Sequence, residues 1–281
     1  MSATTTQPVK APPSGEETWQ LQLFRRSLKK QQKLHALLDV IGPGHGKVCL
    51  LITCGDNNGA LNWHFRAKGG RWTWADAENE SVAQIGQVTG DPVTKFDKES
   101  PFLPFPDHSF DIVITIDVHE HLKSPDLINS ELARIVKRGG KVVVTTPSGD
   151  QARLANRLKN WVGMRKEAYG HVVDGYDVPD LEQQLEAVAL RPQASSSYSG
   201  FFTEVAELAI NFAFVKVMAR RGKVKVQTGQ IAPQSGEQMK SVGKSYRIYS
   251  WLYPLILGMT SLDRWLPSRR GYAVIVVATK E

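Results

Sequence analysis

One short run of the chain, Asp117-Val-His-Glu-His-Leu122, combines residues suited to proton transfer. Histidine titrates near neutral pH, and a neighbouring carboxylate can fix which ring nitrogen carries the proton. Asp117, Glu120 and His121 are therefore candidates for a general base acting on a hydroxyl group, with His119 on the substrate side. The alternative is structural: Glu120 and His121 would fix a turn and cap the following helix.

The same run does not match a metal-binding signature. Its His-x-His spacing differs from the His-Glu-x-x-His pattern of zinc enzymes, and no further cluster of cysteine or histidine along the sequence completes a ligand set. We therefore expect no metal ion.

A second group of residues indicates a ligand with a nucleoside part. An apolar run ends in a glycine-bearing loop, Thr53-Cys-Gly-Asp-Asn-Asn-Gly59, and Asp76 follows Gly55 at about the interval seen for ribose ligands in nucleoside-binding folds. Asp56 lies inside this loop, where it would repel a pyrophosphate but favour a ligand carrying a sulfonium and an ammonium. A dinucleotide is thus a poor fit. The phosphate-binding pattern Gly-x-x-x-x-Gly-Lys-Ser/Thr is also absent, which argues against a nucleoside triphosphatase.

The elements that must position these residues alternate between strand and helix. Apolar runs and residue types predict strands at Val48–Thr53, Arg71–Ala75, Asp111–Ile116, Lys141–Thr145, 191–198 and Tyr272–Thr279. Helical spacing is found at Glu17–Ile41, 59–68, Ser124–Val136, Gln151–Trp161 and Val178–Leu190. Lys137-Arg-Gly-Gly140 is predicted to close the third of these helices. Such alternation predicts an α/β fold with a parallel, doubly wound sheet.

Chain length and net charge limit the number of domains and the kinds of partner that we expect. At 281 residues the chain can hold one large α/β domain or two small ones. The net charge of +7 permits anionic partners. Much of the excess lies in the N-terminal segment and in residues 216–247 rather than as one stripe, so we do not expect a nucleic-acid partner. RNA modification is kept as a third, weaker reading that rests on the charge alone.

The N-terminus and the cysteines bear on localisation. Cys49 and Cys54 are five residues apart on one strand and its loop, so their side chains point to opposite faces and no internal disulfide is expected. The first fifteen residues are polar, rich in Thr and Pro, and lack the pattern of a signal peptide. These features predict a reduced, cytoplasmic protein.

Taken together, these residues resemble the class I S-adenosylmethionine-dependent methyltransferases, in the broad type 11-like subgroup. The most specific piece is Pro104–Leu122 (PFPDHSFDIVITIDVHEHL), and the resemblance covers about residues 30–190 and the final strand. It implies a Rossmann-like sheet of seven strands with the last antiparallel. It also implies S-adenosyl-L-methionine as the cofactor, lying across strands 1 to 3, with the acceptor over strands 4 and 5.

The resemblance carries roles to individual positions. It implies that Asp76 holds the ribose, and that Asp117 through His121 lie beside the transferred methyl group. The other cofactor residues it implies are Thr53, Cys54, Gly55 and Asp56 in the loop, and Phe96 and Asp97 at the adenine. His119, His171 and Tyr176 would face the acceptor. The segment Gly170–Tyr176 is similar to one in members that act on saccharides, lipids or other envelope precursors. Methylation of a base amino group would show Asn/Asp-Pro-Pro-Tyr/Phe after the Asp111–Ile116 strand, and that run is missing, so we expect methyl transfer to oxygen of a small-molecule, saccharide or lipid-linked acceptor.

The loop departs from the family pattern at three positions. The family usually has an acidic residue at Leu51 and glycines at Thr53 and Asn57. These departures sustain an alternative in which the protein is a catalytically degenerate binding or regulatory module of the same fold.

The segment before the last strand is unusually long. Roughly seventy residues separate the last two predicted strands, too many for a passive loop. Phe201–Ala219 is mostly apolar but contains Glu204 and Glu207, so it is a poor transmembrane span. The basic pair Arg220-Arg221 follows Phe201–Ala219, and Arg269-Arg270 follows the aromatic-rich Tyr246–Trp265. Apolar helices with Trp and Tyr next to Lys and Arg suit the headgroups of an anionic membrane.

We therefore divide the chain into four parts. They are a disordered tail (1–16), the methyltransferase core (17–198), a helical insert (199–268) and the final core strand (269–281). The insert is expected to contact the inner face of the membrane peripherally, or to serve as a lid or partner contact.

Overall fold

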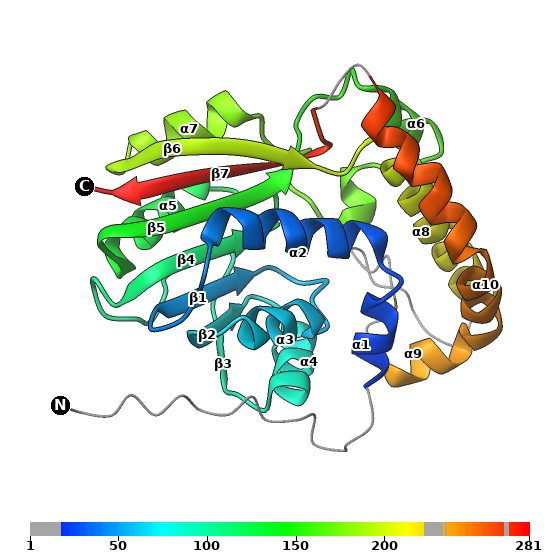
Figure 1. Ribbon diagram of the computed structural model, residues 1–281, viewed down its shortest axis with the longest axis horizontal. Coiled ribbons are helices and arrows are strands. Elements are labelled where there is room, and N and C mark those ends of the chain that lie inside the picture. Colours follow the sequence, from blue (N-terminus) through cyan, green and yellow to red (C-terminus); the bar gives the residue numbers. More distant parts are fainter. Residues whose placement is uncertain (1–17, 222–232, 234, 267–269) are drawn as a thin grey trace.

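A seven-stranded sheet in the order β3-β2-β1-β4-β5-β7-β6 forms the centre of the protein (Figure 1). The strands are β1 (Val48–Thr53), β2 (Arg71–Asp76), β3 (Val93–Lys95), β4 (Phe110–Ile116), β5 (Val136–Pro147), β6 (Leu190–Tyr198) and β7 (Ala273–Lys280). The first five pair in parallel, whereas β7 runs antiparallel to both β5 and β6. The predicted fold class, including the antiparallel last strand, is confirmed.

The computed structural model describes residues 18–221, 233, 235–266 and 270–281. The predicted tail 1–16 and most of the basic stretch that follows Arg221 lie outside these residues. The α-helices are α1 (Trp19–Phe24), α2 (Leu28–Ile41), α3 (Ala60–Ala67), α4 (Asn79–Thr89), α5 (Pro125–Ile135), α6 (Leu154–Trp161), α7 (Val178–Glu186), α8 (Phe201–Arg221), α9 (Gly236–Ser241) and α10 (Gly243–Thr260). Three short 3-10 helices are η1 (His119–His121), η2 (Lys166–Tyr169) and η3 (Ser261–Trp265).

Three local predictions differ from the structure. The helix predicted over Glu17–Ile41 is two helices, α1 and α2, interrupted at residues 25–27. Lys137-Arg-Gly-Gly140 does not form a closing turn, because β5 already begins at Val136, which pairs with Phe110. The pair α4 and β3 was not predicted from the sequence, and β3 is only three residues long.

Apolar side chains fill both faces of the sheet. Leu50 and Ile52 belong to one buried layer, while Cys49 and Leu51 belong to the other. This two-sided burial explains why the central strands are continuous apolar runs rather than alternating ones. Leu51, where the family usually has an acidic residue, is completely buried among these apolar side chains. Both cysteines are buried and free.

The elements between β6 and β7, here called the insert (α8, α9, α10 and η3), lie at the end of the sheet where the parallel strands terminate (Figure 1). Asp263 of η3 accepts hydrogen bonds from the backbone N–H groups of Phe202 (2.7 Å) and Thr203 (3.0 Å), which satisfies the first turn of α8. Tyr246 donates to the carbonyl of Gln22 (3.0 Å), which joins α10 to α1. The insert is thus tied to the core by specific polar contacts.

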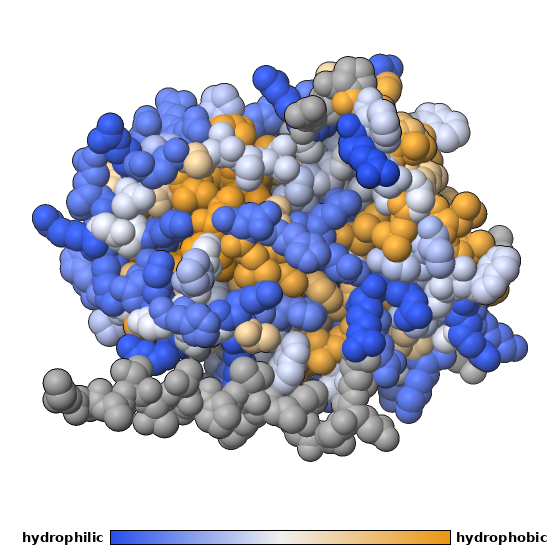
Figure 2. Space-filling view, in the orientation of Figure 1, coloured by the Kyte–Doolittle hydropathy of each residue, from blue (hydrophilic) through white to orange (hydrophobic). Residues whose placement is uncertain are grey.

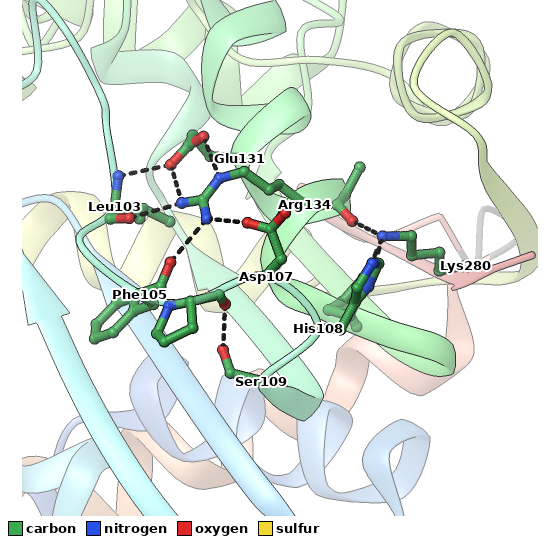
Figure 3. Close-up of polar contacts among 11 residues, drawn as sticks. Leu103, Phe105, Asp107, His108, Ser109, Glu131, Arg134 and Lys280 are labelled. Carbon is green, nitrogen blue, oxygen red and sulfur yellow. Dashed lines mark hydrogen bonds and ion pairs between the residues drawn. The ribbon is translucent and has the colours of Figure 1, made fainter.

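The start of the Pro104–Leu122 segment is held in place by Arg134 of α5. Arg134 of α5 donates hydrogen bonds to the carbonyls of Leu103 and Phe105, both at 2.8 Å, and forms ion pairs with Asp107 and Glu131, both at 2.7 Å (Figure 3). These contacts fix the Leu103–Asp107 loop against α5 immediately before β4. The loop therefore sets where β4 begins.

Replacing Arg134 with Met is expected to lower the free energy of unfolding by about 2 kcal/mol, because two carbonyls and two carboxylates lose a charged donor. Chemical denaturation measures this change. The exposed neighbour Arg138 provides the control, since Arg138→Met should change stability by less than about 0.5 kcal/mol. Equal effects of the two substitutions would show that the Arg134 contacts do not stabilise the fold.

Candidate active site

A cavity of about 900 Å³ lies between the end of the sheet and the insert. Its walls come from the loop after β1, the turn after β4 and the facing sides of α2, α8 and α10. Among the residues predicted for the site, those that line it are Thr53, Cys54, Gly55, Asp56, Asp117, Glu120, His121 and His171. The structure therefore brings the nucleoside-binding loop and the proton-transfer run into one space.

The altered glycine loop is held by its own side chains. The hydroxyl of Thr53 donates to Asp76 (2.5 Å) and accepts from the amide of Asn57 (3.0 Å). Asn57 also donates to Asn62 (3.0 Å) and accepts from the backbone N–H of Gly59 (2.9 Å). The two residues that replace family glycines thus form one buried hydrogen-bonded network that shapes the loop.

This network turns Asp76 away from the cavity. Its carboxylate is completely buried and accepts from Thr53, from the N–H of Gly55 (3.1 Å) and from the N–H of Glu78 (2.8 Å). Asp76 does not line the cavity, because Thr53 and the two N–H groups enclose it, and its ribose role stays a prediction. Glu78, two residues later, lines the cavity and forms an ion pair with Lys98.

The two residues predicted at the adenine also lie outside the cavity lining. Phe96 is buried in the apolar layer with Leu50 and Ile52, and its N–H donates to the carbonyl of Asp76. Asp97 is exposed and accepts a hydrogen bond from the N–H of Glu99 (3.0 Å). Phe96 therefore packs in the core, and the adenine role of both residues stays a prediction.

Asp117 ends β4 at the floor of the cavity with a positive φ of 50°. Its carboxylate forms an ion pair with Lys33 of α2, which is buried. Burial opposes the charged forms of both groups, but their mutual attraction outweighs it, raising the pKa of Lys33 and lowering that of Asp117. Asp117 is therefore a fixed anion whose charge is largely balanced by Lys33.

Glu120, His121 and His171 come together beside Asp117. Nδ1 of His121 lies 3.0 Å from the carbonyl of Gly170, and the N–H of Val172 donates to the carbonyl of Glu120 (2.7 Å). The two imidazole rings contact edge to face, with centroids 4.8 Å apart. Burial lowers the pKa of both histidines, that of His171 to about 3, with help from the neighbouring His121. Both rings are thus neutral at pH 7.

His119 and Tyr176 do not line the cavity. His119 is fully buried and its Nε2 lies 2.8 Å from Oδ1 of Asn129 on α5. Burial lowers its pKa to about 4. Tyr176 packs edge to face against His119, with ring centroids 6.4 Å apart. The two side chains pack on the side of η1 that faces away from the cavity, and neither lines the cavity.

Glu204 of α8 and its two lysine partners were not predicted from the sequence. Glu204 is 1% exposed and pairs with Lys29 of α2 at 2.7 Å and with Lys159 of α6 at 2.5 Å. Burial would raise the pKa of Glu204, but the two lysines outweigh it and hold that pKa well below its usual range. Lys29 and Lys33 lie four apart on α2, a spacing typical of a solvated face, so no local signal indicates that Lys29 pairs with Glu204 and Lys33 with Asp117.

Comparison with known proteins agrees with this architecture. Residues 50–144 match the family model of a methyltransferase domain. No curated protein matches the sequence. Similar solved structures include an S-adenosylmethionine-dependent methyltransferase of Thermotoga maritima, with a TM-score of 0.52, 14% identity and coverage of 92% of this chain and 93% of that one.

Two further structures share the fold. The [4+2]-cyclase SpnF has a TM-score of 0.53 and 17% identity, with 89% of this chain and 80% of that one covered. Phosphoethanolamine N-methyltransferase 2 of Haemonchus contortus, in complex with S-adenosylhomocysteine, has a TM-score of 0.51 and 16% identity, with 88% and 52% covered.

The sheet order and the antiparallel last strand are those of the class I methyltransferase fold, and the domain match lies within its first five strands. Residues 50–144 thus match a methyltransferase domain, and the fold around them is shared with solved S-adenosylmethionine-dependent methyltransferases.

The buried Asp76 makes stability depend on pH. Burial outweighs its three hydrogen bonds and raises its pKa from 3.8 to about 6. The native state thus binds this proton more tightly than the unfolded state, so the stability from Asp76 is present below pH 3.8 and lost as pH rises through 6. Relative to Asp76→Asn, the wild type should gain about 2 kcal/mol between pH 7 and pH 4. Denaturation at both pH values measures this, with exposed Asp97→Asn as the control; a gap that does not change with pH would contradict it.

Proposed function

We propose that the protein transfers the methyl group of S-adenosylmethionine to an oxygen of a small-molecule, saccharide or lipid-linked acceptor. The observation that carries this proposal is the single cavity joining the Gly55 loop to His121 and His171 and continuing beneath α8 and α10. Its volume is within the usual range for small-molecule sites, about 300–1,000 Å³.

The residues present fit the cofactor at one end of this cavity. Gly55 has a φ of +84°, and a Cβ there would lie 3.1 Å from Cγ of Glu78, so the loop requires glycine. Asp56 and Glu78 supply carboxylates along the same wall, suited to an ammonium group and to ribose hydroxyls. We assign the ribose to Glu78 because Asp76 is enclosed. When bound, the cofactor supplies a methyl group already activated by its sulfonium.

His121 is placed to take the proton from an acceptor hydroxyl. A carbonyl only accepts hydrogen bonds, so Gly170 fixes the proton of His121 on Nδ1 and leaves Nε2 as an acceptor. The ring is neutral at pH 7, since burial lowers its pKa. The ion pair between Asp117 and Lys33 lies beside this ring. Because the sulfonium already activates the methyl group, alignment of the hydroxyl and removal of its proton carry most of the rate.

The far part of the cavity favours an acceptor with an apolar portion. Its wall on α10 carries Tyr249, Leu252, Ile256 and Met259, and its wall on α8 carries Leu208 and Phe214. Burying an apolar chain against such a wall contributes about 25 cal/mol for each Å² removed from water. A lipid-linked or otherwise partly apolar acceptor fits this wall better than a free sugar does.

Glu78→Gln should weaken binding of S-adenosylhomocysteine about tenfold or more, because charged hydrogen bonds to ribose contribute about 1.5–3 kcal/mol. Titration calorimetry of the purified chain measures the dissociation constant. Glu99→Gln is the matched control, since Glu99 is exposed, pairs with Lys123 and does not line the cavity. A folded wild type that binds neither S-adenosylmethionine nor S-adenosylhomocysteine would support the alternative of a degenerate binding module.

We also propose that α10 contacts an anionic membrane from which a lipid-linked acceptor is drawn. Its outer side exposes Trp251 (80%) and Leu255 (72%), and Figure 2 shows apolar surface over this part of the molecule. Lys244 and Arg247 are exposed at the start of the same helix. Apolar and aromatic side chains next to cations suit the headgroup region of an anionic leaflet. Within the described part of the chain, no helix is both long and apolar enough to cross a bilayer.

The double substitution Trp251→Ser and Leu255→Ser should reduce binding to vesicles containing anionic phospholipid at least about tenfold, since each buried side chain contributes about 1.5–3 kcal/mol. Vesicle co-sedimentation provides the measurement. Leu127→Ser on α5 is the control, because Leu127 is 46% exposed and lies outside the insert. Unchanged sedimentation of the double variant would exclude this surface as the membrane contact.

A further inference from the structure

We propose that Glu120, His121 and His171 bind one divalent transition-metal ion at the acceptor end of the cavity. One potential ligand atom from each residue lies within 4.8 Å of the other two. All three residues line the cavity. Ligand atoms on one ion with bonds of about 2.0–2.2 Å lie about 3–3.5 Å apart. Small side-chain rotations therefore suffice to close the site around an ion.

An unpaired buried oxygen of Glu120 is a second, independent observation that indicates a bound cation. Its side chain is completely buried, yet Oε1 has no hydrogen-bond partner among the residues described. The other oxygen, Oε2, accepts from the hydroxyl of Thr146 (3.1 Å). An unpaired buried carboxyl oxygen is costly; burial and the nearby Asp117 raise the pKa of Glu120, and a bound cation is the partner that would stabilise its charged form.

The backbone around the three side chains already holds them in place. Segment 170–173 is fastened to η1 because Val172 and Val173 both donate N–H groups to the carbonyl of Glu120, at 2.7 and 3.3 Å. In return, the carbonyl of Gly170 orients His121 through Nδ1. A metal-bound histidine usually has its second nitrogen held in this manner. Nε2 of His121 is thus left for the ion.

The donor set indicates which ions bind. Two imidazoles and one carboxylate are the ligands of catalytic zinc sites and of other first-row divalent ions, whereas Mg²⁺ prefers oxygen ligands. The described residues offer these three ligand groups and no fourth to the cluster. Three protein ligands leave a coordination position open, and here it faces the cavity. This is the arrangement of a catalytic site rather than a closed structural one.

The role of the ion rests on the proposed methyl transfer. An acceptor hydroxyl bound at the open position would have its pKa lowered by the ion, so that it loses its proton to water in the cavity. The resulting oxygen forms the new bond to carbon as the carbon–sulfur bond breaks and the sulfur keeps the electron pair. Nε2 of His121 is then a ligand of the ion and water takes the proton, whereas in the metal-free protein Nε2 is the group that takes it.

The test uses the full-length, tag-free chain after removal of metals with a chelator. Titration with ZnCl₂ and with MgCl₂ is followed by calorimetry, and CoCl₂ serves as a visible-absorption probe of coordination. We expect one equivalent of Zn²⁺ to bind, Mg²⁺ to bind at least about 100-fold more weakly, and Co²⁺ to give the absorption of a nitrogen-containing site of low coordination number.

Variants locate the ion. His171→Gln and Glu120→Gln should each weaken Zn²⁺ binding by about 100-fold or more, since loss of even an outer partner costs about 10–100-fold. His35→Gln, which removes an exposed histidine on α2, should leave it unchanged. Stoichiometric Zn²⁺ binding that survives in His171→Gln would place the ion elsewhere and overturn the proposal. If both site variants fail to fold, the wild-type titration decides.

The wild-type titration can overturn the metal site on its own. A metal-free wild type that binds S-adenosylhomocysteine but not one equivalent of Zn²⁺ would overturn the metal site and leave the proposed function standing. A folded wild type that binds Zn²⁺ but no S-adenosylhomocysteine would instead contradict the proposed function while supporting the site.

Discussion

The carboxylate of Glu204 is charged although its side chain is only 1% exposed. The arrangement of the site depends on the two lysines that balance this charge. Lys29 and Lys159 approach it from α2 and α6, so three helices meet at one carboxylate. Removing one partner of a buried ion pair typically costs about 3–5 kcal/mol, because the remaining charge has no water to solvate it. The insert is therefore fixed in a definite position over the sheet, and the cavity beneath it has definite walls.

The helix α2 contacts both Glu204 of the insert and Asp117 of the candidate site. Lys29 and Lys33 lie one turn apart on its inner side, the first paired with Glu204 of the insert and the second with Asp117 of the core. The same helix thus aligns the roof and the floor of the cavity. With Asp117 occupied by Lys33, the groups left to act on an acceptor are Glu120, His121 and His171. Their positions follow from backbone contacts between η1 and segment 170–173.

Much of the fold could be predicted because its signals are local. The apolar runs at Val48–Thr53 and Asp111–Ile116 are buried on both faces, which is the reason they lack alternation. The strand β3 was missed because three residues at the sheet edge carry no pattern. The start of β5 was misplaced because Lys137 and the two glycines resemble a turn, although Val136 is already paired with Phe110.

The site was predicted less well, because its geometry depends on contacts distant in sequence. Asp76 has the expected spacing from Gly55, but its direction is set by the hydroxyl of Thr53, and Glu78 lines the cavity in its place. His171 meets His121 fifty residues away, which no spacing pattern could indicate. His119 belongs to the same run as His121, yet the 3-10 turn directs it into the core toward Asn129. In each case the type of residue was suited to the predicted role, but contacts with residues distant in sequence set the direction of its side chain.

A crystal structure of the protein with S-adenosylhomocysteine would show directly whether the cavity beneath the insert holds the cofactor. We expect the amino acid portion at the Gly55 loop, the ribose hydroxyls on the carboxylate of Glu78 in place of Lys98, and the sulfur directed toward His121 and Asp117. Ribose bound to Asp76 would show that the Thr53 network opens on binding and would contradict the assignment to Glu78. A ligand outside the cavity between the sheet and the insert would contradict the account as a whole.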